Sequence, residues 1–129
     1  MNALRSILAV TLGYIVFAVP AFAFFRVLGR DPHQTAPVWF MACGTACGVL
    51  FAVVGTYVAG RVAGRSLFAH AVALAVVIAI GAAASLVSTL GHSAIWSQVT
   101  ALLFVAPSAA LAGWLRSRSR ALPRRSDEA

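Results

Sequence analysis

Charge is what this sequence lacks most. Its 129 residues include no lysine and only three acidic residues. Charged residues of all kinds make up 10% of the chain, whereas about 25% is usual in a soluble domain. Hydrophobic residues make up 61%, and the mean hydropathy is +0.91. A water-soluble fold of this size could not cover its surface with so few charges, so we expect lipid to surround most of the chain.

The shortage of acidic residues also disfavours two classes of function. None of the three lies in a hydrophobic stretch. In length the chain is similar to the small multidrug-resistance exporters, which rely on a membrane-embedded glutamate in their first helix. Here the corresponding segment has Tyr14 and no acid between Arg5 and Arg26. Proton coupling needs a titratable group inside the membrane, so a proton-coupled exporter is disfavoured. No nucleophile–base pair is present either, and we predict that the chain is not an enzyme.

Cysteine and histidine are equally sparse. Cys43 and Cys47 are the only cysteines and lie four residues apart in an apolar segment, which places them on one helix face rather than in a disulfide framework. The three histidines form no HxxxH pattern, and there is no CxxC. We therefore predict no metal site and no cofactor.

Long uncharged runs define the membrane segments. Runs of 20, 29 and 50 residues lie between successive charges. A helix of 50 residues would be about 75 Å long, against a hydrocarbon core of about 30 Å, so the last run must fold back. Gly91-His92-Ser93 is the polar, helix-ending break near its middle. The prediction is an all-α, antiparallel bundle of four transmembrane helices over about 5–27, 37–59, 67–90 and 95–115, forming one domain over 1–115.

Aromatic spacing supports two of these segments. Trp39 and Tyr57 are 18 residues apart, as are Trp96 and Trp114. Eighteen helical residues span about 27 Å, so each pair can reach both interfaces, where Trp and Tyr concentrate.

The arginines predict the orientation. With four spans, eight arginines share one side of the membrane, while Arg26 and Arg30 lie on the other. The positive-inside rule then places both termini and the 60–66 turn in the cytoplasm. Arginine as the sole basic residue, with abundant Ala, Val and Gly, favours a bacterial source and hence the bacterial inner membrane. Cleavage of the first segment, considered below, would leave the other three helices in the same orientation.

The net charge of +7 is gathered at segment ends and in the tail. This distribution favours anionic lipid headgroups rather than nucleic acid as the partner. We expect the 116–129 tail to be disordered and to lie along the headgroups. The predicted contacts with anionic lipid are Arg61, Arg65, Arg116, Arg118 and Arg120.

Two alternatives concern the first half. Arg5, an apolar run and Ala21-Phe22-Ala23 are also typical of a secretory signal peptide, whose cleavage would remove residues 1–23 and leave three helices. We favour retention, because the apolar run continues to Arg26. The segments starting at Arg5 and Arg65 also begin alike, which leaves a duplication of a two-helix unit open beside chance similarity.

Small residues recur at four-residue spacing. Gly44 and Gly48 form a GxxxG pattern, Ala109 and Gly113 a similar pair, and Gly81 precedes a serine by four. Small residues let membrane helices approach closely, so we predict that these five pack helices together. Packing within the bundle is the first expectation, and a homodimer or larger membrane complex is the alternative.

Polar residues gather in the outer half of the predicted bundle. Ser85, Ser88 and His92 fall on one helix face. Other polar residues lie at similar depth on neighbouring segments, and if these groups converge they line a cavity open to the periplasm. We favour the alternative that the serines and threonines bond to carbonyls of their own helix or across to neighbouring helices. The candidate cavity-lining residues are Ser85, Ser88, Thr89, His92, Gln98, Thr100 and Thr45.

These observations favour two functions of different class. The first is a structural, accessory or interaction protein whose helices pack with one another or with a larger complex. The second is a small oligomeric transporter or channel for a neutral or lipid-like solute. The sequence itself identifies neither a solute nor a partner protein.

Overall fold

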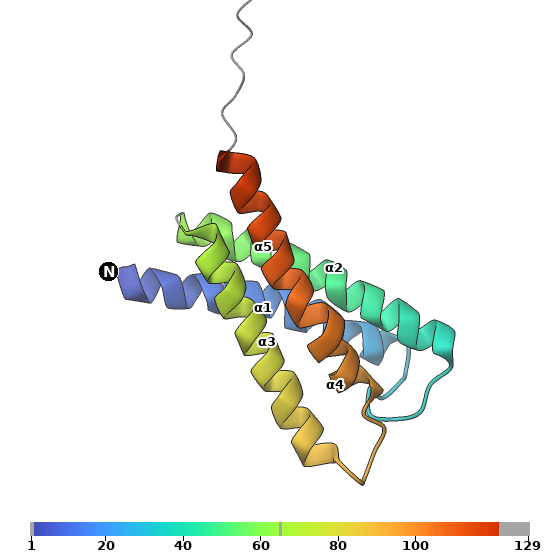
Figure 1. Cartoon of the computed structure of the whole chain (residues 1–129). Coiled ribbons are helices and arrows are strands. Elements are labelled where there is room, and N and C mark those ends of the chain that lie inside the picture. Colours follow the sequence, from blue (N-terminus) through green and yellow to red (C-terminus); the bar gives the residue numbers. More distant parts are fainter. Residues whose placement is uncertain (1, 65, 122–129) are drawn as a thin grey trace, which may run out of the picture.

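Four helical rods account for most of the chain. The computed structural model describes residues 2–64 and 66–121, and no strand occurs among them. The elements are α1 (Asn2–Val27), α2 (Val38–Ala63), α3 (Leu67–Thr89), α4 (Trp96–Thr100), the π-helical segment η1 (Ala101–Val105) and α5 (Ala106–Ala121). The last three follow one another directly and form the fourth rod (Figure 1). Each rod is long and apolar enough to cross a membrane, which confirms the predicted four-helix transmembrane bundle.

Three helix boundaries differ from the prediction by more than one residue, the first being the start of α1 at Asn2 rather than at about 5. The second helix continues to Ala63 rather than 59, and ends at Gly64, which has the left-handed φ of +71° typical of a residue after a helix. The fourth rod continues to Ala121 rather than 115, so the predicted disordered tail begins as helix. Arginine is a good helix former and is favourable near the negative end of the helix dipole. Residues 122–129 lie outside the described residues.

The rods form two antiparallel hairpins that cross obliquely (Figure 1). One hairpin pairs α1 with α2, and the other pairs α3 with the fourth rod. The N-terminus, the α2–α3 turn and the end of α5 lie at one end of the bundle, here called the basic end. Loops 28–37 and 90–95 lie at the opposite end, here called the loop end.

The hairpins contact one another through small and aliphatic residues. Leu74 of α3 is fully buried, and its Cδ2 packs near both Gly13 of α1 and Gly55 of α2. The largest buried cluster joins α2, α3, η1 and α5; its members are Ala52, Leu74, Ala75, Ile78, Val105, Ala106 and Ala109. From this contact toward the loop end, α1 and α3 diverge (Figure 1).

Aromatic rings fill the loop end between the hairpins. Phe40 of α2 is 1% exposed, with its ring centroid 5.6 Å from that of Phe24 and 6.3 Å from that of Trp96. Phe25 contacts Phe40 and Trp96 as well. The first, second and fourth rods therefore meet at these rings. The packed rings position the two loops at this end of the bundle.

Candidate functional site

Three of the seven side chains predicted to line a polar cavity meet at the loop end. Gln98 of α4 is 4% exposed. One N–H of its Nε2 is shared between Oγ of Ser85 at 3.3 Å and Oγ1 of Thr89 at 3.2 Å, both on α3. The hydroxyl of Ser97 lies 2.9 Å from Gln98 Oε1 and shares its one proton between this oxygen and the Pro32 carbonyl described below. Together with His33, these residues form what we call the Gln98 cluster, and it ties α3 to α4.

His33 reaches the cluster from the loop between α1 and α2. Its Nδ1 lies 2.7 Å from Nε2 of Gln98. An amide nitrogen only donates, so Nδ1 accepts, and the neutral ring then carries its proton on Nε2. The backbone N–H of His33 donates to Oδ1 of Asp31 at 2.8 Å, and its carbonyl accepts from the N–H of Ala94 at 2.9 Å. The loop is therefore fixed to the second hairpin.

Two further bonds hold the same loop. The hydroxyl of Ser97 lies within 2.9 Å of the Pro32 carbonyl, and the indole N–H of Trp96 donates to the Gln34 carbonyl at 3.0 Å. Trp96 is half-buried against Phe25 at this end of the bundle. Its role here is to hold the loop.

The other four candidate cavity residues lie apart from the cluster. Thr45 and Thr100 line a smaller hollow of about 110 Å³, and each bonds to a carbonyl of its own rod. Ser88 and His92 are exposed; Ser88 bonds to the Ser85 carbonyl, and His92 lies 3.0 Å from the Leu90 carbonyl. The predicted set of seven therefore does not line one cavity: three of these four residues bond to carbonyls of their own rod, and His92 lies in the loop after α3.

A groove of about 390 Å³ lies beside the Gln98 cluster, where α1 and α3 diverge. Aromatic and small residues of α1 form one wall, among them Tyr14 and Phe17. Ile78, Gly81 and Ala82 of α3 belong to the other wall. His33, Ser85, Ser97 and Gln98 also line it. The groove thus combines an apolar length with a neutral hydrogen-bonding group.

Sequence reasoning missed the contributions of α1 and of the first loop. Tyr14 and Phe17 stand three apart and therefore share a helix face, which was the available signal. His33 gave no such signal, because its partner Gln98 is 65 residues away.

Four of the five predicted packing residues lie inside the bundle. A Cβ on Gly48 would lie 3.1 Å from Cγ2 of Val105, and one on Gly44 would lie 3.5 Å from both Phe24 and Trp96. Ala109 is fully buried, and Gly113 lies directly against Ala71 of α3. Gly81 differs from the prediction. It is exposed at the groove, and a Cβ there would meet only the Tyr14 hydroxyl, at 3.8 Å.

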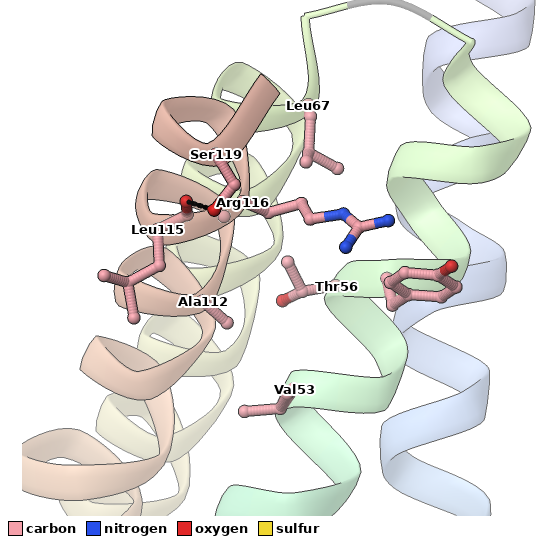
Figure 2. Close-up of a pocket in the computed structure, with 9 residues that line it drawn as sticks. Val53, Thr56, Leu67, Ala112, Leu115, Arg116 and Ser119 are labelled. Atoms are coloured by element: carbon pink, nitrogen blue, oxygen red, sulfur yellow. Dashed lines mark hydrogen bonds between the residues drawn. The ribbon is translucent and has the colours of Figure 1, made fainter. Parts of the chain in front are cut away.

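A second hollow, of about 360 Å³, lies at the basic end between α2 and α5 (Figure 2). Val53, Thr56 and Ala112 line its apolar part, and the Thr56 hydroxyl donates to the Ala109 carbonyl at 3.3 Å. Arg116 extends across the hollow toward α2, with its guanidinium carbon 5.4 Å from the Tyr57 ring centroid (Figure 2).

The other predicted lipid-contacting arginines surround this hollow or follow it. Arg61 donates to the Tyr57 hydroxyl at 3.0 Å, and its guanidinium lies 5.3 Å from the same ring. Arg118 lies over Trp114, 4.6 Å from its ring centroid, and Arg120 is exposed near the end of α5. Arg65 lies outside the described residues. Arg61, Arg116 and Arg118 therefore lie over the rings of Tyr57 and Trp114, which are residue types that concentrate at membrane interfaces.

Comparisons with known proteins add no further constraint on this bundle. No family model, no curated protein and no solved structure matches the chain. The arrangement of its own residues therefore has to carry the functional argument.

Proposed function

We propose that this chain is a structural or accessory protein of the bacterial inner membrane, and not an enzyme. Gln98 carries this proposal. It is the most buried polar side chain of the loop end, and its hydrogen bonds go to α3, to α4 and to the first loop. A polar group committed in this way rigidifies a scaffold. Because Gln98 already bonds to other residues of the protein, its amide group is not available to bind a solute.

The distribution of arginines supports the proposed orientation. Arg5 donates to the Val62 carbonyl at 2.9 Å, so it lies at the same end as Arg61 and Arg116. Arg26 and Arg30 lie at the loop end. By the positive-inside rule, the basic end faces the cytoplasm, where Arg61, Arg116, Arg118 and Arg120 contact anionic headgroups.

Site-specific photocrosslinking in native membranes tests the accessory role. A photoreactive residue is placed at Leu50, Ile80 or Leu103, which are 58%, 64% and 64% exposed on three different rods. The matched control is the fully buried Leu74. We expect at least one exposed position to crosslink to a defined membrane protein or a second copy, and Leu74 to give none. Crosslinks to lipid alone at every exposed position would contradict the proposal.

A second candidate function, a carrier for a neutral or lipid-like solute, is favoured by the groove between α1 and α3. If the groove conducts, Ser85→Ala slows solute flux into vesicles containing the purified protein. Ser88→Ala does not, because Ser88 is exposed and bonds only to its own helix. Flux equal to that of empty vesicles, for the unaltered protein, would remove this candidate.

A further inference from the structure

Two hollows at the loop end lie next to each other. The groove beside the Gln98 cluster shares four lining residues with a neighbouring hollow of about 610 Å³; these are Phe22, Phe25, Pro32 and His33. The groove runs along α1 at membrane depth. The neighbouring hollow of about 610 Å³ lies around the end of α1, where Arg26, Arg30 and Asp31 line it. We call these two hollows together the amphipathic site, because an apolar groove lies beside a charged hollow.

The charge of this site is positive and is held in place. Arg26 lies over the Phe22 ring, 5.8 Å from its centroid, and Arg30 lies over the buried Phe40, at 5.2 Å. Stacking on a ring face leaves the N–H groups at the guanidinium edge available to a phosphate. Asp31 also lines the hollow, but it accepts the His33 N–H. Two arginines against one carboxylate leave a net positive charge.

Because an apolar groove and a positively charged hollow lie side by side, we infer that the amphipathic site binds one anionic phospholipid at the loop end. An acyl chain lies in the groove against Tyr14, Phe17 and Ile78, and the headgroup phosphate bonds to Arg26 and Arg30. Basic pockets between transmembrane helices bind anionic headgroups in this way. A free phosphate would use the arginines but not the groove. A neutral lipid would use the groove but not the arginines.

The loop is built to keep this geometry. Hydrogen bonds from Gln98, Ser97 and Trp96 fix His33, Pro32 and Gln34, so the wall shared by the two hollows does not depend on the ligand. This inference rests on the two adjacent hollows and not on the accessory role, so either can fail without the other. It also concerns binding at the end opposite the basic tail, where the sequence predicted no lipid site.

Mapping with a photoactivatable lipid tests the site directly. The protein is placed in vesicles containing phosphatidylglycerol with a diazirine on one acyl chain. We expect crosslinked peptides from 14–25 of α1 and 78–85 of α3. Competition by unlabelled phosphatidylglycerol reports affinity, and the paired substitutions Arg26→Gln and Arg30→Gln should weaken it about tenfold or more. Both arginines are exposed, and removing positive charge from this side keeps the orientation favoured by the positive-inside rule.

Two further variants separate the parts of the site. Ala82→Phe fills the groove and should abolish crosslinking to 78–85 while leaving the arginines intact. The charge-matched control, Arg116→Gln with Arg118→Gln at the basic end, should leave the loop-end crosslinks unchanged. Equal competition by phosphatidylcholine would overturn the inference. So would equal competition by water-soluble glycerol phosphate, or unchanged affinity after the loop-end arginines are replaced.

Discussion

Gly13 of α1 and Gly55 of α2 contact each other backbone to backbone. A Cβ on Gly55 would lie 2.5 Å from the Gly13 carbonyl oxygen, and a Cβ on Gly13 would lie 2.8 Å from the Gly55 carbonyl oxygen. The obstacle on each side is main chain, which cannot rotate away. Lipid supplies little hydrophobic drive for helices to associate, so close backbone approach of this kind does much to hold α1 against α2.

Gly55→Ala should therefore separate α1 from α2 and destabilise the bundle by about 1–3 kcal/mol. The measurement is reversible unfolding in mixed micelles with increasing dodecyl sulfate. Gly81→Ala is the matched control, since it brings the same gain in helix propensity at an exposed position with only the Tyr14 hydroxyl nearby. Equal stabilities for the two variants would contradict the contact.

Replacing Gln98 should break the hydrogen bonds of the whole Gln98 cluster. Gln98→Leu keeps the volume but leaves Nδ1 of His33 and the hydroxyl of Ser97 without this partner, at a cost of about 1–3 kcal/mol. Hydrogen exchange at the Ala94 amide, which donates to the His33 carbonyl, should accelerate.

The control for that experiment is Thr100→Val, because Thr100 bonds to the Ser97 carbonyl within its own rod. We expect its exchange at Ala94 to match the unaltered protein. If Gln98→Leu also leaves that amide protected, the loop is held by something other than the cluster.

At the basic end, packing should outweigh hydrogen bonding. Thr56→Val removes only the bond to the Ala109 carbonyl, which is worth about 0.6 kcal/mol in a membrane protein. Gly113→Ala puts a methyl against the Ala71 methyl and should cost about 1–3 kcal/mol. Ala71→Gly in the same chain should restore much of the loss, as unfolding of the single and double variants would reveal. Additive losses would refute direct contact.

Hydropathy and charge spacing predicted the four rods because a segment that crosses lipid must form its backbone hydrogen bonds within itself, and a helix does so. The start of α3 at Leu67 was predicted to the residue. The end of the fourth rod was predicted too early. The prediction ended the helix at the first charged residue, whereas the helix continues through Arg116–Arg120 beyond the apolar stretch.

The site was predicted only in part. Ser85 and Thr89 share a helix face, and their convergence with Gln98 follows from one hairpin. His33 joins from the other hairpin, and no local periodicity encodes a contact between hairpins. The Gly13–Gly55 contact did carry a signal. Ala9 and Gly13, like Gly55 and Ala59, are small residues four apart, and both alanines are fully buried.

The four-pass topology, on which the whole account depends, is tested most directly by cysteine accessibility in intact cells. In a chain with Cys43 and Cys47 replaced by Ala, single cysteines are introduced at exposed positions of both ends: Thr35, Ser66, Ser93 and Ser119. A membrane-impermeant maleimide should label the Thr35 and Ser93 positions in intact cells, and the Ser66 and Ser119 positions only after permeabilisation. Labelling of the Thr35 and Ser119 positions from the same side, or release of the protein from membranes by alkaline carbonate, would contradict the account.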